Sequence, residues 1–271
     1  MKALFLSALM ASVIGGAFLA LVRQMECRSV FFPTKGLDTT PAEVGLPFEE
    51  VRFQAPGGVR LHGWFIPHQS PRGTLLYLHG NAGNIGGRLD KTSVFRSLGL
   101  SVFLFDYRGY GNSGGSPTEA GILKDTEAAY RVLMERGVDP DKVVIYGESL
   151  GGAPAVYLAE KVKKGFLVTE GAFSSVCDMA RVTFPLLPSW LLASRFDSAA
   201  SIRRVRIPKL IIHSRGDEVV PVAMGRKLAQ NAPEPKRYIE LEGGHNSYYA
   251  AAPALFRDSI DAFLNDHGLA A

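Results

Sequence analysis

The chain has 271 residues, of which 46% are hydrophobic, and a net charge of +4 at pH 7. This length and composition are typical of one large globular domain and exclude a predominantly disordered chain. The weak positive charge comes without the basic and aromatic clusters or the zinc-finger spacing of nucleic-acid-binding proteins, so we expect no nucleic-acid partner.

The first segment of the chain is strongly apolar. Residues 3–22 carry no charge and are followed by Arg23. About 20 apolar residues match the thickness of a bilayer core, so we expect residues 1–24 to form an N-terminal transmembrane anchor. A cleaved signal peptide is the alternative, because residues 15–17 (Gly-Gly-Ala) offer a weak cleavage site. The short basic leader favours a location of the remaining chain on the exported, periplasmic or extracytoplasmic side, either anchored or secreted after cleavage.

Short apolar runs alternate with helical patterns along the rest of the chain. After a linker at residues 25–50, residues 51–67 read as two strands joined by a Pro-Gly-Gly turn. Later runs are typical of strands buried on both faces of a parallel sheet, at residues 73–78, 101–106, 142–147, 165–169, 209–213 and 236–241. For residues 51–271 the pattern predicts an α/β fold, with a mostly parallel, doubly wound sheet opened by an antiparallel hairpin.

The alternation is interrupted between residues 174 and 208, where no strand pattern occurs. The centre of this segment, TFPLLPSWLLASRF, is rich in apolar residues. A long insertion between core strands is usually functional, so we expect a short lid. A pair of surface helices that pack their leucines inward is the alternative. The apolar side chains that we expect to contact substrate are Phe184, Leu186, Leu187, Trp190 and Leu191.

Glycines flank a serine between a strand pattern and a helical pattern. Gly147-Glu148-Ser149-Leu150-Gly151 fits G-x-S-x-G, in which a tight strand–turn–helix exposes the serine hydroxyl at the edge of a sheet. The glycines lack the Cβ atoms that would collide where strand and helix approach each other. Helix N-terminal amides would also face negative charge that develops near the serine. We therefore predict that Ser149 is a nucleophile.

Residues 109–116 contain two competing patterns. The sequence around Ser113 also fits G-x-S-x-G, and residues 109–114 fit the dinucleotide fingerprint G-x-G-x-x-G. Pro117 delays the next helix until after the glycines, whereas a dinucleotide site needs the helix to begin directly beneath the pyrophosphate. We therefore expect a loop here and no organic cofactor.

A serine hydroxyl needs a general base, and the base needs an orienting carboxylate. Asp217 and His245 each follow a predicted strand, in loops at the same edge of the sheet as Ser149. We therefore expect these three side chains to meet. Glu218 is the competing acid, but the tight turn at Gly216 favours Asp217.

Acyl transfer also needs hydrogen-bond donors for a developing oxyanion. The backbone N–H of Leu150 directly follows the nucleophile, and the backbone N–H of Asn81 lies in the loop after the strand at residues 73–78. A glycine-rich turn with no active role is the alternative for the second loop. No histidine has a partner at metal-ligand spacing, so we expect no metal.

Five motifs are spread along nearly the whole chain: HGNAGN at 79–84, DYRGYG at 106–111, GESLGG at 147–152, GD at 216–217 and GGHN at 243–246. Together they resemble the α/β-hydrolase superfamily, and more narrowly its membrane-anchored branch of bud-emergence-type hydrolases and depalmitoylase-like relatives. The resemblance implies that Ser149 is the nucleophile, Asp217 the orienting acid and His245 the base, in this order along the chain. It also implies that Asn81 and Leu150 donate to the oxyanion and that the 106–111 loop is structural support.

From the residues and the resemblance we expect a serine hydrolase that cleaves carboxylic ester or thioester bonds of acyl or lipid-like substrates through an acyl-enzyme. The 174–208 segment is too short for the large cap domains of some relatives, which puts bulky, enclosed substrates in doubt. An aminopeptidase-like peptidase is one alternative, with Glu148 or Glu170 binding the substrate amine. A non-catalytic binding protein on the same fold is another, although it predicts damaged motifs that this sequence does not show. Nothing in the sequence indicates an oligomeric state.

Overall fold

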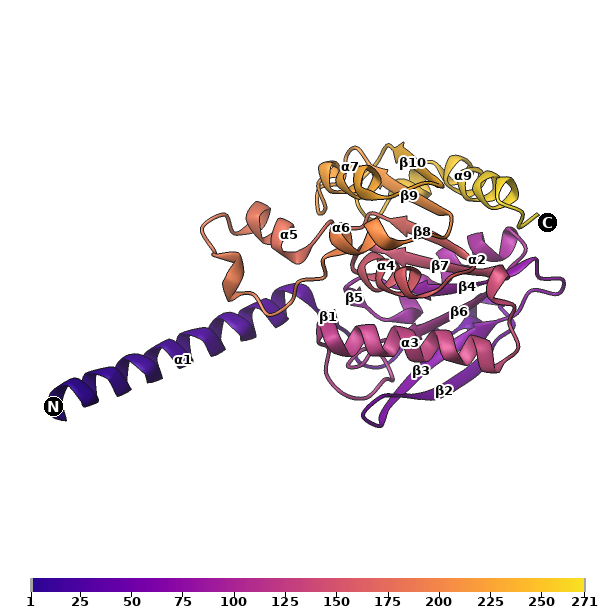
Figure 1. The fold of residues 1–271 in the computed structure, drawn as a ribbon. Helices are drawn as coiled ribbons and strands as arrows, with labels where there is room; N and C mark the ends of the chain where they lie inside the picture. The colour runs from indigo at the N-terminus through magenta and orange to yellow at the C-terminus, as the bar shows by residue number, and fades with distance from the viewer. Residues whose placement is uncertain (1, 271) are drawn as a thin grey trace.

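The structure is a computed structural model. It describes residues 2–270, without the side chains of residues 2–4, 6, 8, 11, 27 and 248. An eight-stranded sheet lies at the centre of the molecule, with strands in the order β10-β9-β8-β7-β4-β6-β3-β2 (Figure 1). In chain order the bounds are β2 Glu49–Ala55, β3 Val59–Ile66, β4 Gly73–Leu78, β6 Leu100–Asp106, β7 Val143–Glu148, β8 Phe166–Glu170, β9 Lys209–Ser214 and β10 Lys236–Leu241.

The two ends of the sheet differ in strand direction. Strands β2 and β3 form the predicted antiparallel hairpin, and β3 also pairs antiparallel with β6. All pairs from β6 to β10 are parallel. The prediction of a mostly parallel α/β sheet opened by an antiparallel hairpin is therefore confirmed.

Helices cover both faces of the sheet because its central strands are apolar on both sides. Along β4, Leu76 and Leu78 belong to one buried cluster, and Leu75 and Tyr77 to the other, as the alternation of side chains in a strand requires. The first cluster includes residues of α3, α4, α6 and α7, and the second includes residues of α2 and α9. The helix bounds are α1 Lys2–Val30, α2 Leu89–Ser97, α3 Glu119–Glu135, α4 Gly152–Lys161, α5 Val176–Thr183, α6 Ser198–Ser201, α7 Val222–Asn231, α8 Tyr248–Ala251 and α9 Pro253–Asp266.

Helix α1 projects away from the sheet and meets the rest of the molecule at its C-terminal end (Figure 1). It continues to Val30, so residues 25–30, which the sequence assigned to a linker, are helical. None of the helices among residues 2–270 is long and apolar enough to cross a membrane, and the predicted transmembrane anchor at residues 1–24 is not supported.

The segment after α1 is attached to the loop that follows β4. A short parallel pair joins β1 (Phe32–Pro33) to β5 (Ala82–Gly83). The backbone N–H of Phe32 donates to the carbonyl of Asn81 at 2.9 Å, and that of Thr34 to the carbonyl of Gly83 at 3.1 Å. The N-terminal segment therefore contacts the loop that was predicted to supply an oxyanion donor.

The insertion between β8 and β9 contains α5, a short 3₁₀ turn at Ser189–Leu191 and α6. In Figure 1 it extends from the carboxyl ends of the strands towards the end of α1. The expected absence of a strand from residues 174–208 agrees with this arrangement of the described residues. We call residues 174–208 the lid segment, because of their position at the carboxyl ends of the strands.

Candidate active site

A tight turn joins β7 to α4 at Ser149. The backbone of Ser149 has φ of 52°, in the left-handed region that is strained for a serine. A Cβ atom on Gly151 would lie 2.0 Å from the carbonyl oxygen of Leu78, and one on Gly147 would lie 2.4 Å from the carbonyl oxygen of Gly151. Only glycine permits such close backbone approach, which explains both glycines of the motif. Pro154 falls in the first turn of α4, where proline is tolerated.

The structure brings together the three side chains that the sequence singled out. Ser149 follows β7, Asp217 follows β9 and His245 follows β10, all at the carboxyl edge of the parallel strands. The Ser149 Oγ lies 2.9 Å from Nε2 of His245, and Nδ1 of His245 lies 2.7 Å from Oδ2 of Asp217. Because an ionised carboxylate can only accept hydrogen bonds, this arrangement assigns the ring proton to Nδ1 and leaves Nε2 to accept from serine.

The Asp217 carboxylate is fixed on both sides. Its Oδ1 accepts hydrogen bonds from the backbone N–H groups of Val219 at 3.0 Å and Val220 at 2.6 Å, which leaves Oδ2 directed at His245. Glu218 instead accepts from the backbone N–H of His245 at 2.9 Å. Asp217 therefore orients the imidazole ring, whereas Glu218 holds the backbone of the same loop.

The loop after β4 lies beside the serine. Asn81, Ser149 and Leu150 line the same cavity. The Asn81 carbonyl accepts hydrogen bonds from the N–H of Phe32 and, at 2.8 Å, from the hydroxyl of Tyr110, so the backbone at this point is held from two directions. Leu150 belongs to the first turn after the strand, where backbone N–H groups lack intrahelical partners.

His79, at the start of that loop, is a buried neutral residue. Burial lowers the pKa of its ring to about 3. The ring packs against Tyr107 and Tyr110, at centroid distances of 4.3 and 5.2 Å, and the Tyr107 hydroxyl donates to the His79 carbonyl at 3.1 Å. Residues of the 106–111 segment thus buttress the loop that carries Asn81.

A cluster of buried charges lies behind the nucleophile. The Lys91 ammonium is 3.2 Å from the Glu148 carboxylate and 2.8 Å from the Glu170 carboxylate. Glu148 also accepts from the Tyr77 hydroxyl at 2.7 Å and pairs with Arg88 at 3.1 Å. Burial alone would raise the pKa of the Glu148 carboxyl, but Lys91 and Arg88 outweigh burial and lower the pKa to about 2. This cluster was not predicted from the sequence, because its cations come from α2 and the turn before it.

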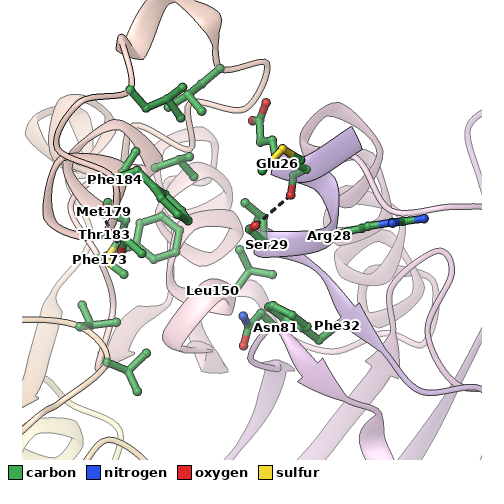
Figure 2. A pocket seen from close by; sticks show the side chains of 18 of the residues that line it. Glu26, Arg28, Ser29, Phe32, Asn81, Leu150, Phe173, Met179, Thr183 and Phe184 are labelled. Atoms are coloured by element: carbon green, nitrogen blue, oxygen red, sulfur yellow. Dashed lines mark hydrogen bonds between the residues drawn. The ribbon is translucent and has the colours of Figure 1, made fainter. Parts of the chain in front are cut away.

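A cavity of about 470 Å³ is lined by Ser149. Figure 2 shows this cavity, with Asn81 and Leu150 among the labelled lining residues. Of the predicted lid residues, Phe184 and Leu187 line it. Leu186 and Trp190 are exposed, and Leu191 is buried outside the lining. Other lining residues are mainly apolar and include Phe173, Val176, Met179, Ala180, Leu192, Val219 and Val220.

One wall of the cavity comes from a part of the chain to which no site residue had been assigned. Val22, Met25, Glu26 and Ser29 of α1 line it, together with Arg28 and Val30 at the end of the helix. Figure 2 shows Glu26 and Ser29 on one side of the cavity and Phe173 and Phe184 on the other. The 22, 25, 26, 29 spacing puts these residues on one helical face, a sequence signal that was missed because residues 1–24 were assigned to an anchor and residues 25–50 to a linker.

The competing motif at Ser113 serves a structural purpose. Its buried hydroxyl donates to the Asp106 carbonyl at 2.6 Å and accepts from the N–H of His62 at 2.9 Å. The next helix, α3, begins only at Glu119, so residues 109–116 form a loop, as expected.

Within residues 2–270, no group of three or more His, Cys, Asp or Glu side chains is arranged to hold a metal ion. Cys177 is a half-buried free thiol, and the side chain of Cys27 lies outside the described part of the structure.

Comparisons with known proteins agree with this architecture. A family model described as the alpha/beta hydrolase fold matches residues 73–191. The chain is 35% identical over 270 residues to the uncharacterized protein Rv2307c of Mycobacterium tuberculosis, covering 98% of this chain and 96% of that protein. It is also 39% identical over 195 residues to protein bem46 of Schizosaccharomyces pombe, covering 67% and 64% of the two chains. The fold is similar to that of the Pyrococcus furiosus esterase Pf2001, with a TM-score of 0.73 and 21% identity over 87% of this chain and 98% of that one.

A parallel sheet with a nucleophile-elbow turn and a Ser–His–Asp hydrogen-bonded chain defines the hydrolase class of α/β proteins. The chain belongs to the α/β-hydrolase family.

The Lys91 cluster leads to a prediction about stability. Replacing Lys91 with Met leaves two buried carboxylates facing each other, so we expect Lys91→Met to lower the free energy of unfolding by about 3–5 kcal/mol. Lys163→Met removes an exposed lysine and should change it by less than about 0.5 kcal/mol. Urea denaturation measures both variants; equal losses would contradict a role for the cluster.

The low pKa of Glu148 predicts a pH dependence. Its pKa falls from 4.5 to about 2 on folding, so its contribution to stability is complete above pH 4.5 and disappears as the pH falls towards 2. The shift corresponds to about 3 kcal/mol. We expect the stability difference between the wild type and Glu148→Gln to shrink over this interval in urea titrations at fixed pH. A difference that stays constant from pH 6 to about pH 2 would show that folding does not lower the pKa of Glu148.

Proposed function

We propose that this protein is a serine hydrolase that cleaves carboxylic ester or thioester bonds of acyl or lipid-like substrates through an acyl-enzyme. The observation that carries the proposal is the hydrogen-bonded chain Ser149–His245–Asp217, with its serine end on an apolar cavity. Membership of the α/β-hydrolase family supports the reaction class. The apolar lining supports the substrate class, because an apolar cavity favours a hydrocarbon chain over a polar one.

In the first half-reaction, Nε2 of His245 takes the hydroxyl proton as the Ser149 Oγ attacks the carbonyl carbon of the substrate. The negative charge moves to the carbonyl oxygen, where the backbone N–H groups of Asn81 and Leu150 donate hydrogen bonds. Asp217 stabilises the imidazolium that forms. His245 then gives its proton to the leaving alcohol or thiol as the bond to the carbonyl carbon breaks, which leaves an acyl-serine.

In the second half-reaction, His245 takes a proton from water, and the hydroxyl attacks the acyl carbon. The tetrahedral intermediate collapses with release of the carboxylic acid, and the proton returns from His245 to the Ser149 oxygen. No other reactant is required, so the net reaction is hydrolysis.

The two alternative functions have less support from the site. A peptidase that binds a substrate amine needs an accessible carboxylate, whereas Glu148 and Glu170 are both paired with the Lys91 ammonium. A non-catalytic binding protein needs no strained serine and no ordered Ser–His–Asp chain, yet both are present.

The proposal predicts which substitutions remove hydrolysis of p-nitrophenyl esters and acyl thioesters by the full chain. Ser149→Ala should lower kcat by on the order of 10³–10⁶. Asp217→Asn should lower it by on the order of 10⁴, because the Asn amide can donate to Nδ1 of His245, which moves the ring proton to Nε2 and removes the acceptor for the Ser149 proton. The matched neighbour Glu218→Gln should retain most of the activity, since its carboxylate accepts from the backbone N–H of His245, whereas the ring is bound by Asp217.

A graded series of acyl esters, from acetate to palmitate, tests the substrate class in the same assay. Activity should rise as the acyl chain lengthens and fills the cavity. Full activity in Ser149→Ala would contradict the nucleophile, equal losses in Asp217→Asn and Glu218→Gln would contradict the assigned acid, and a series without chain-length preference would contradict the acyl substrate.

A further inference from the structure

One wall of the cavity beside Ser149 is formed by α1, which lies outside the hydrolase core. Val22, Met25, Glu26 and Ser29 recur at intervals of three and four residues and so share one face of α1. The opposite wall is formed by α5 and the residues that follow it, among them Met179, Phe184 and Leu187. Val22 is 8% exposed and Glu26 7%, whereas Leu21 is 54% exposed, so Val22 and Glu26 point inward and Leu21 points outward; Met25, at 58%, lies at the open side of the cavity.

A carboxylate attaches this face of α1 to the lid segment. Glu26 is 7% exposed, and its two oxygens accept the backbone N–H groups of Ala193 at 2.7 Å and Ser194 at 2.6 Å. A buried carboxylate is costly without such partners, and hydrogen bonds to an ionised acceptor are stronger than those between neutral groups. Glu26 therefore fixes the distance between the two walls of the cavity.

The same stretch of the lid segment is held by a second carboxylate. The next two backbone N–H groups, those of Arg195 and Phe196, donate to Glu119 of α3 at 2.6 and 2.7 Å. Four consecutive backbone N–H groups thus donate to two glutamates, Glu26 in α1 and Glu119 in α3 of the hydrolase core. The first two amides can be released from α1 without releasing the last two from α3, which makes the role of Glu26 separable by experiment.

We propose that α1 is part of the substrate site, and that Glu26 is a positioning residue that sets the acyl-chain length accepted between α1 and the lid segment. This inference rests on the proposed function and adds the element that selects among its substrates. A long acyl chain bound at Ser149 lies between α5 and the face of α1 that carries Val22 and Met25. A short acyl group needs only the region around the serine, so the α1 wall affects long substrates more than short ones.

The first test fills the cavity from the α1 side in the full chain. Val22→Trp adds bulk to the inward face, and Leu21→Trp adds the same bulk to the exposed face as a control. We expect Val22→Trp to lower the ratio of kcat/KM for p-nitrophenyl dodecanoate to that for p-nitrophenyl acetate by about tenfold or more, since lost contacts of a few methylenes have effects of this size. Leu21→Trp should leave the ratio unchanged.

The second test releases the lid segment. In Glu26→Gln, one carboxylate oxygen becomes an amide NH₂ that faces a backbone donor. We expect KM for the dodecanoate ester to rise and hydrogen exchange at the amides of residues 193–194 to accelerate, while exchange at residues 195–196, bound to Glu119, stays as in the wild type. Unchanged exchange elsewhere in the chain shows that the variant is folded.

The outcomes distinguish a failure of this inference from a failure of the proposed serine hydrolase function. If Val22→Trp keeps the wild-type ratio, or if Glu26→Gln keeps wild-type exchange at residues 193–194, the inference is overturned and the serine hydrolase stands. If the wild type cleaves no ester, or Ser149→Ala cleaves it equally well, both are overturned.

Discussion

The close approach of backbone atoms at the end of β7 is the constraint on which the site depends. Gly151 lies against the Leu78 carbonyl so closely that no side chain fits, and this contact forces the left-handed turn at Ser149. The turn lifts the serine oxygen to the carboxyl edge of the sheet. Because β9 and β10 end at the same edge, Asp217 and His245 reach the serine from short loops, and the whole hydrogen-bonded chain is carried by strand ends.

Buried charges hold the parts around this turn in place. Behind the serine, Lys91 joins the carboxylates of Glu148 and Glu170, which lie on adjacent strands. In front of it, Glu26 joins α1 to the lid segment through backbone amides. Removing one partner of a buried ionic group leaves an uncompensated charge, so these contacts resist being broken one at a time. Polar contacts therefore hold both the residue before the nucleophile and the α1 wall of a mainly apolar cavity.

The sheet could be predicted from the sequence because each central strand is apolar on both faces. The proximity of Ser149, Asp217 and His245 could be predicted because each residue follows a strand that ends at the same edge of the sheet. The lid contacts were harder, since an irregular segment has no fixed period: Phe184 and Leu187 face the cavity, whereas Leu186 and Trp190 face outward. The contribution of α1 to the cavity was missed because the apolar run at residues 3–22 was interpreted as an anchor and residues 25–50 as a linker, whereas one helix continues to Val30. Lys91 was missed because a lysine in a helix gives no local sign of a buried partner.

The most direct test of the account is covalent labelling of the full chain with an alkyl fluorophosphonate, followed by peptide mapping by mass spectrometry. An activated serine displaces fluoride and gains the phosphonyl group, whereas an ordinary surface serine does not react. The account predicts one adduct per chain, on Ser149, and no adduct in Ser149→Ala or at Ser113. An adduct on another residue, or equal labelling of the Ser149→Ala variant, would contradict it.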